Sequence, residues 1–269
     1  SVGVPGRGDS WVTQPENLKW AARLGSQTYG SPVIAGGKVF IGTNNGAPRN
    51  SRLTGDRHVL MCFSEADGKF LWQMATPRRA RSANFNPDYG MLGLCVAAAV
   101  DDSRAYVVTS RCDVVAMALD PLGPEKKPIY ARQASYLAFP ASEHVSASRS
   151  GPVVSIRPGR PVALSQSDAN LAWVYDMVAG AGSWPHEASS SSVLQVGDVL
   201  YVGTANGKGS DHRTTPSPGG ASLIALDKRS GKLLARDNAG IAPGVFHGQW
   251  SSPSYGVVNG RPLVFYGGG

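Results

Sequence analysis

The sequence predicts an all-β fold, a β-propeller of four-stranded antiparallel blades, and two observations carry that prediction. The first is an internal repeat: segment 39–46 (VFIGTNNG) returns as 200–207 (LYVGTANG), and segment 61–72 returns as 224–235 in the same order. Repeats of this kind are typical of architectures built from one recurring unit. The second is that short apolar runs alternate with turns in a chain of 269 residues with 33 glycines and 19 prolines, which favours strands over helices.

The first blade is expected over residues 28–76. Its four strands are predicted by the apolar runs 31–34, 38–41, 59–63 and 69–73. The pairs Gly36-Gly37 and Asp67-Gly68 between them are typical of hairpin turns. Four antiparallel strands in about 45 residues match one propeller blade.

The rest of the chain repeats this pattern less completely. A second blade is expected over 93–176, with a Pro/Ser/Arg-rich insertion at 120–170 that emerges as loops and holds a candidate strand at 161–164. A third blade is expected over 188–238 and an incomplete fourth over 249–269, while 17–22 is expected to be the outer strand of a preceding or closing blade.

That count gives about three and a half blades, and propellers close with roughly 4 to 8. We therefore expect a fragment of a propeller of roughly seven or eight blades, which continues past Gly269.

The net charge of +7 does not predict nucleic-acid binding, because the basic residues are dispersed apart from Arg78, Arg79 and Arg81. That cluster is expected to be a solvated loop after a strand, with an acidic partner as the alternative. No apolar run approaches the roughly 18 residues that span a membrane, so no transmembrane segment is expected.

The three cysteines, Cys62, Cys95 and Cys112, show no CxxC spacing. They predict neither a zinc site nor a disulfide framework. We expect all three to be structural and reduced, with Cys62 acting as a small buried hydrophobe in a strand.

At its repeated segments the chain resembles the pyrroloquinoline-quinone (PQQ) repeat β-propellers, which have the quinoprotein alcohol dehydrogenase-like fold. Their signature is approximately Ala-x-Asp-x-x-Thr-Gly-x-x-x-Trp, and it matches best at 225–232, in part at 62–72 and in its first half at 118–120. The residues that carry it here are Gly68, Trp72, Asp120, Trp173, Asp227 and Gly231. Their expected roles are structural: glycine permits the positive φ of a hairpin, tryptophan fills the gap between blades, and aspartate accepts backbone hydrogen bonds.

Segments 24–32 and 247–253 resemble segments of the bacterial secreted members of the PQQ-repeat family. That resemblance implies an exported protein, periplasmic or secreted, with no established activity for most members.

The candidate ligand site lies at the mouth of the central channel, where loops enter the inner strand of each blade. These loops carry Gln27, Tyr29, Trp184, His186, Glu187, His247, Gln249 and Trp250. Polar and aromatic groups that converge at such a mouth predict a ligand site. The alternative is that these side chains plug the channel and hydrogen-bond the loop backbones.

No metal is expected there, because His186 and His247 lack a third ligand of defined spacing. His144 and His212 are expected to be solvated loop residues, and the tripeptide Arg7-Gly8-Asp9 is discounted as an adhesion motif.

Three functions remain open from the sequence. The first is a non-catalytic propeller that binds a small ligand or a protein partner in the cell envelope. The second is a dehydrogenase of alcohols or sugars that uses PQQ and calcium, although Cys95 is followed by Val96 and the adjacent Cys-Cys pair of that pattern is missing. The third is a scaffold for outer-membrane protein assembly.

Overall fold

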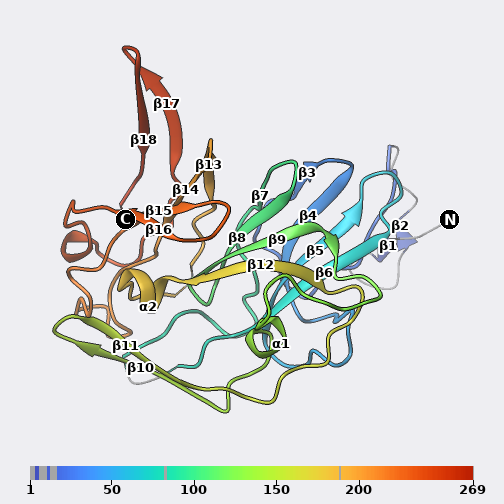
Figure 1. The fold of residues 1–269 in the computed structure, drawn as a ribbon, viewed down its shortest axis with the longest axis horizontal. Coiled ribbons are helices and arrows are strands. Elements are labelled where there is room, and N and C mark those ends of the chain that lie inside the picture. Colours follow the sequence, from blue (N-terminus) through green and yellow to red (C-terminus); the bar gives the residue numbers. More distant parts are fainter. Residues whose placement is uncertain (1–3, 6–10, 13–16, 82–83, 188, 269) are drawn as a thin grey trace.

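The computed structural model describes residues 4–5, 11–12, 17–81, 84–187 and 189–268, and the regular secondary structure of these residues is almost entirely antiparallel sheet, joined by long loops. Three four-stranded sheets stand side by side, with two-stranded hairpins around them (Figure 1). Each four-stranded sheet runs up and down in chain order from its inner to its outer strand. The predicted fold class, a partial β-propeller of four-stranded blades, is confirmed by this topology.

The first and third blades are the two regular ones. The first contains β3 (Val33–Ala35), β4 (Lys38–Asn44), β5 (Arg57–Ser64) and β6 (Phe70–Pro77). The third contains β13 (Leu194–Val196), β14 (Val199–Gly203), β15 (Leu223–Asp227) and β16 (Leu233–Arg236).

The two repeated segments occupy equivalent places in these blades. Gly42 lies on β4 and pairs with β5, and Gly203 lies on β14 and pairs with β15. At both positions a Cβ would collide with the neighbouring blade: with the Leu94 carbonyl oxygen at 2.4 Å for Gly42, and with the Tyr266 ring at 2.9 Å for Gly203. The repeated glycine therefore allows adjacent blades to approach closely.

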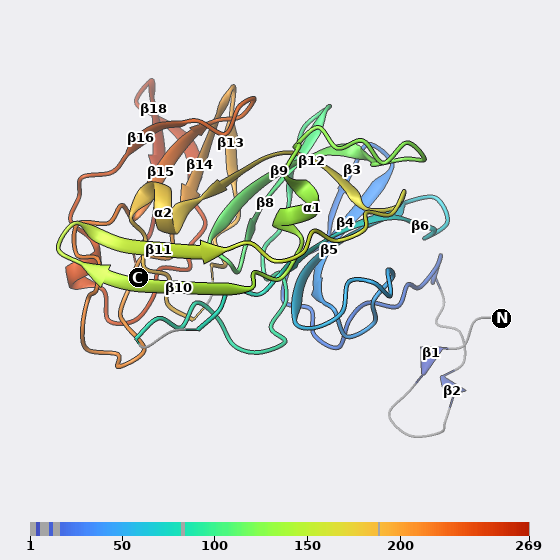
Figure 2. The same ribbon diagram turned by 60° about the horizontal axis from the view of Figure 1, so that its bottom comes forward.

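The second blade contains β7 (Ala99–Val100), β8 (Arg104–Thr109), β9 (Asp113–Pro121) and β12 (Ala169–Asp176). Between its last two strands, the insertion forms α1 (Gln133–Tyr136) and a hairpin of β10 (Ser142–Ser148) with β11 (Gly151–Arg157). The hairpin runs across the blades rather than along one, and α2 (Met177–Ala181) packs on it (Figure 2). The candidate strand at 161–164 is wrong, because that segment is irregular and attaches through the Val162 N–H to the Ala134 carbonyl at 3.0 Å.

The remaining elements are the hairpin of β17 (Ser254–Val258) and β18 (Arg261–Phe265), the 3-10 turn η1 (Ala242–Gly244), and β1 (Val4–Pro5) paired with β2 (Trp11–Val12). The β17–β18 hairpin is a two-stranded sheet within 249–269, the segment in which an incomplete fourth blade is expected. The predicted outer strand at 17–22 is wrong, since these residues form no strand. The tripeptide at 7–9 lies outside the described residues.

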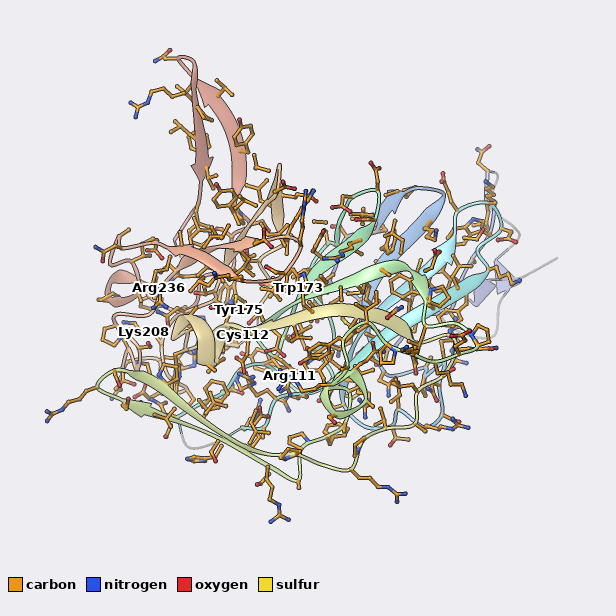
Figure 3. The ribbon with its side chains drawn as sticks, in the orientation of Figure 1. Arg111, Cys112, Trp173, Tyr175, Lys208 and Arg236 are labelled. Carbon is orange, nitrogen blue, oxygen red and sulfur yellow. The ribbon has the colours of Figure 1, made fainter. Side chains whose placement is uncertain are left out.

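Tryptophan rings cover the last turns of the first and third blades, and Trp173 thereby links the second blade to the third. Trp20 donates its indole N–H to the Glu65 carbonyl at 2.9 Å, and Trp173 (labelled in Figure 3) donates to the Lys228 carbonyl at 3.1 Å. Their rings cover the turn glycines Gly68 and Gly231, both with φ of 71°.

Of the other three signature residues, two have the structural role expected of them and one does not. Trp72 is buried and donates to the Leu119 carbonyl at 2.8 Å. Asp227 caps its turn by accepting from the Ser230 N–H at 2.8 Å. Asp120, by contrast, is exposed and only faces Lys38 at 3.8 Å, because β9 runs on into the insertion where the turn would be.

A buried ion network attaches the insertion to the second blade. Arg79 Nη2 lies 2.6 Å from Asp176 Oδ2, and its Nε lies 3.2 Å from Glu143 Oε1 on β10. Arg111 adds ion pairs to Asp113 at 3.1 Å and to Glu143 at 3.3 Å. The expectation that the basic cluster is solvated is therefore wrong for Arg79, which is fully buried because three carboxylates surround it.

Candidate functional site

An open hollow of about 300 Å³ lies where the loops enter the inner strands of successive blades. It is lined by Tyr29, Tyr89, Leu92, Cys95, Glu187, Ser190 and Trp250. Tyr29, Tyr89 and Trp250 are exposed by 64%, 51% and 41%, and several exposed rings around one hollow are informative in a way that a single exposed residue is not. The hollow is therefore a surface with aromatic walls that the rest of the fold leaves uncovered.

Four connections build this hollow. Tyr29 precedes β3, Tyr89 and Cys95 lie between β6 and β7, Glu187 lies between α2 and β13, and Trp250 lies just before β17. In an up-and-down blade, these connections all lie at one end of the strands. The repeat thus brings together residues that are far apart in the sequence.

Beside the hollow, three histidines and one carboxylate converge. Their potential ligand atoms, one each from His186, Glu187, His212 and His247, all lie within 4.8 Å of one another. His186 Nε2 and His247 Nε2 are 3.3 Å apart, and Glu187 Oε1 lies 3.7 Å from His186 Nε2 and 3.9 Å from His212 Nε2. Glu187 Oε2 lies 3.7 Å from His247 Nδ1.

His186 is the buried member of this His/Glu cluster. Its Nδ1 lies 2.9 Å from the carbonyl of Lys208 (labelled in Figure 3), so Nδ1 carries the proton and donates, which leaves Nε2 with its lone pair facing the cluster. Burial, and next the neighbouring His247, lower the pKa of His186 below its usual value. The ring is consequently neutral at pH 7.

His212 reaches the cluster from the loop between β14 and β15. Asp211 shapes that loop by accepting from the N–H groups of Arg213 and Thr214, both at 3.0 Å. The backbone of His212 has φ of 56° and that of Glu187 has φ of 63°, both in the left-handed region. Non-glycine residues adopt this region only where the surroundings impose it.

Glu187 connects the cluster to the hollow. Its Oε1 accepts a hydrogen bond from the Tyr89 hydroxyl at 2.6 Å, and its backbone N–H donates to the Asn86 carbonyl at 3.2 Å. The carboxylate raises the pKa of Tyr89, because the phenol donates to it.

The structure gathers five of the eight sequence-predicted site residues. Tyr29, Glu187 and Trp250 line the hollow, while His186 and His247 belong to the His/Glu cluster beside it. The His247 and Trp250 rings meet edge to face with centroids 5.3 Å apart, so the two groups adjoin.

The other three predicted residues do not face the hollow. Trp184 is buried and packs edge to face on Phe85 at 5.1 Å. Gln249 is buried and donates to the Asn206 carbonyl at 2.6 Å, which is the plugging role foreseen as the alternative. Gln27 is exposed and does not line the hollow; its backbone carbonyl accepts from the Thr43 hydroxyl at 2.7 Å.

The sequence prediction missed His212 and Tyr89. His212 was expected to be a solvated loop residue apart from the site, and the structure places it in the cluster, with its ring centroid 4.5 Å from that of His247. A topological signal existed: in an up-and-down blade the loop between the second and third strands lies at the same end as the loop entering the first. His144, by contrast, is exposed on β10 as a solvated residue.

A second hollow of about 350 Å³ lies over the Arg79 network. The charged groups at its floor, Arg79, Arg111 and Asp113, already pair with one another and with Glu143. These charged groups hold the insertion in place, and because they already have partners they are not a candidate ligand site.

The residues do not fit the PQQ arrangement that the resemblance implies. All three cysteines are free, Cys62 and Cys112 are buried in or beside strands, and Cys95 is followed by Val96. An adjacent Cys-Cys disulfide cannot form from them.

No protein-family model matches this chain, and no curated protein matches it. Among solved structures, it is similar to the computationally designed Ika4 protein, with 10% identity, coverage of 94% of this chain and 99% of that one, and a TM-score of 0.35. It is also similar to quinohemoprotein alcohol dehydrogenase from Comamonas testosteroni (14% identity, 88% of this chain, 39% of that one, TM-score 0.39). A third is BamB from Moraxella catarrhalis (14% identity, 79% and 65%, TM-score 0.26).

These values assign neither a family nor an activity, so the fold assignment rests on the strand pairing described above. In the part of the chain that the structure describes, no helix combines the length and the apolar character that crossing a bilayer requires.

Proposed function

We propose that this protein is a non-catalytic binding propeller whose aromatic hollow takes a small ligand with a flat apolar face. One observation carries the proposal: the rings of Tyr29, Tyr89 and Trp250 surround a hollow of about 300 Å³ while remaining largely exposed. That volume lies at the lower end of the range for small-molecule sites, roughly 300–1,000 Å³. Aromatic walls suit a planar ligand, because stacked or edge-to-face rings attract one another.

The resemblance to exported repeat proteins supports a place for this propeller in the cell envelope, periplasmic or secreted. No cofactor forms part of the proposal.

Indole is a suitable probe, since it offers a flat apolar face and one hydrogen-bond donor. We expect ligand-observed NMR to detect indole binding to the purified protein, and Trp250→Ala and Tyr29→Ala each to weaken it about tenfold. Such a loss corresponds to the roughly 0.5–1.5 kcal/mol of a ring pair plus the lost contact area. Tyr29 is 64% exposed, so Tyr29→Ala leaves the core intact. Trp250 also donates its indole N–H to the His186 carbonyl at 3.3 Å, so Trp250→Ala is compared with the unaltered protein by circular dichroism before binding is measured.

Tyr255→Ala is the matched control, because Tyr255 is an exposed aromatic on β17 that does not line the hollow. Indole binding that survives both hollow variants, or that falls equally in the control, contradicts the proposal. Dye-linked alcohol oxidation after addition of PQQ and calcium would replace it with the dehydrogenase function.

A further inference from the structure

We propose that His186, Glu187, His212 and His247 form a zinc site that ties together three loops on one face of the propeller. The loops are those between α2 and β13, between β14 and β15, and between η1 and β17. Glu187 also lines the hollow, but the three histidines do not, so zinc binding can be measured separately from the ligand proposed there.

The spacing of the ligand atoms matches a tetrahedral ion. Ligands bound at 2.0–2.1 Å around a tetrahedral zinc lie roughly 3.3–3.4 Å from one another. The two Nε2 atoms of His186 and His247 already have this separation, at 3.3 Å. Glu187 Oε1 lies 3.7 Å from His186 Nε2 and 3.9 Å from His212 Nε2, and these two distances need to shorten by about half an ångström. The 3.7 Å distance between Glu187 and His247 involves the other ring nitrogen, Nδ1, and is not a ligand spacing of this site, because one imidazole binds one ion through one nitrogen.

The carboxylate distances also argue against a simple hydrogen-bonded cluster. Hydrogen bonds between a ring N–H and a carboxylate oxygen are roughly 2.7–3.2 Å long. All three Glu187-to-histidine distances exceed that range, although one potential ligand atom of each of the four residues lies within 4.8 Å of the others. His186 Nε2 and His247 Nε2 are close enough to bond to each other at 3.3 Å, but Glu187 is not hydrogen-bonded to any of the three histidines at these distances.

Hydrogen bonds from outside the cluster orient two of the four proposed zinc ligands. The hydrogen bond from His186 Nδ1 to the Lys208 carbonyl fixes the tautomer with a free Nε2 lone pair. The hydrogen bond from the Tyr89 hydroxyl orients the Glu187 carboxylate. Ligating histidines in zinc sites almost always donate their second ring N–H to a carbonyl or carboxylate in this way.

The donor set favours a transition metal, and a tetrahedral arrangement of four ligands favours zinc among these. Three imidazoles and one carboxylate suit zinc, whereas calcium and magnesium prefer oxygen ligands alone. Four protein ligands fill a tetrahedral shell, which is the composition of a structural site. The ion is therefore expected to stabilise the folded state, because it binds the assembled loops and not the unfolded chain.

The test is to remove bound metal from the purified protein with a chelator and then to titrate it with ZnCl₂. Isothermal calorimetry measures the affinity, metal analysis measures the zinc content, and scanning calorimetry measures the Tm. We expect one zinc per chain and a rise in Tm that grows with zinc concentration. Loss of an outer-shell partner already weakens zinc binding about 10- to 100-fold, so His212→Ala is expected to weaken it by at least about 100-fold. His212 is the decisive position, because its side chain is about half exposed and its removal leaves the core intact.

His144→Ala is the matched control, since His144 is an exposed histidine on β10 outside the cluster. We expect it to bind zinc like the unaltered protein. Cobalt gives a second readout, because four-coordinate Co²⁺ absorbs visible light strongly, and that absorption should disappear in His247→Ala and Glu187→Gln variants that keep the native circular dichroism.

Three results would overturn the inference: no zinc bound by the unaltered protein, unchanged affinity in His212→Ala, or equal loss in His144→Ala.

Discussion

The indole ring of Trp173 lies directly over Gly231, so that a Cβ at position 231 would stand 2.5 Å from the ring. Trp173 belongs to the outer strand of the second blade and Gly231 to the last turn of the third, and the indole N–H also bonds the Lys228 carbonyl of that turn. The ring can pack on the turn of the next blade because glycine has no side chain at that position.

Gly231→Ala should therefore destabilise the protein by about 2–5 kcal/mol. A positive φ costs a residue with a Cβ about 1–2 kcal/mol, and the collision with Trp173 adds about 1–3 kcal/mol. Gly197→Ala is the matched control, because Gly197 has φ of 59° in a turn of the same blade with open space around its Cβ position. Urea denaturation measures both, and equal losses would show that the ring contact contributes nothing.

The buried network around Arg79 gives a second prediction. Arg79→Met should lower the free energy of unfolding by about 3–5 kcal/mol, because it removes the cation and leaves buried carboxylates of Asp113 and Glu143 with fewer partners. Arg157→Met on the exposed side of β11 should change stability by less than about 0.5 kcal/mol. Denaturant midpoints would test this, and a small effect of Arg79→Met would mean that the insertion is held by other contacts.

The lowered pKa of Asp101 predicts that the stability of the folded protein depends on pH. Burial opposes its ionisation, but the N–H groups of Ser103 and Arg104 and two hydroxyls donate to it, and the net effect lowers the pKa of Asp101 to about 2. A lowered folded pKa contributes stability that is present above the unfolded value of about 3.9 and is lost as pH falls towards 2.

Asp101→Asn should consequently cost about 1–3 kcal/mol at pH 7 and almost nothing near pH 2. Thermal melts of both proteins from pH 7 to pH 2 would measure the difference. A difference that does not shrink with acid would show that the charge of Asp101 is not what stabilises the turn.

The cysteines should react slowly in the folded protein. Burial raises the pKa of Cys62 and of Cys112 to about 12, and that of Cys95 to about 11, so few thiolates exist at pH 8. We expect an aromatic disulfide reagent to modify Cys95 first, because it lines the open hollow, and to modify all three only after unfolding. Rapid reaction of three thiols in the native state would contradict the burial described here.

The sequence alone determined the blades. Strand and turn positions follow from local rules, since alternating apolar runs and positive-φ glycines such as Gly68 and Gly231 need no knowledge of distant residues. The packing of tryptophan on the next blade also follows from the repeat, because equivalent residues of equivalent units meet equivalent neighbours.

Only the tertiary structure decided what the loops and the insertion do. From the sequence, Arg79 is expected to be a solvated cation, but the structure places three carboxylates from other elements around it. His212 reads as an isolated loop residue until the blade topology places it against His186 and His247. The physical reason is that charge pairing and ligand convergence depend on distances between segments far apart in the chain, and local sequence carries no record of those distances.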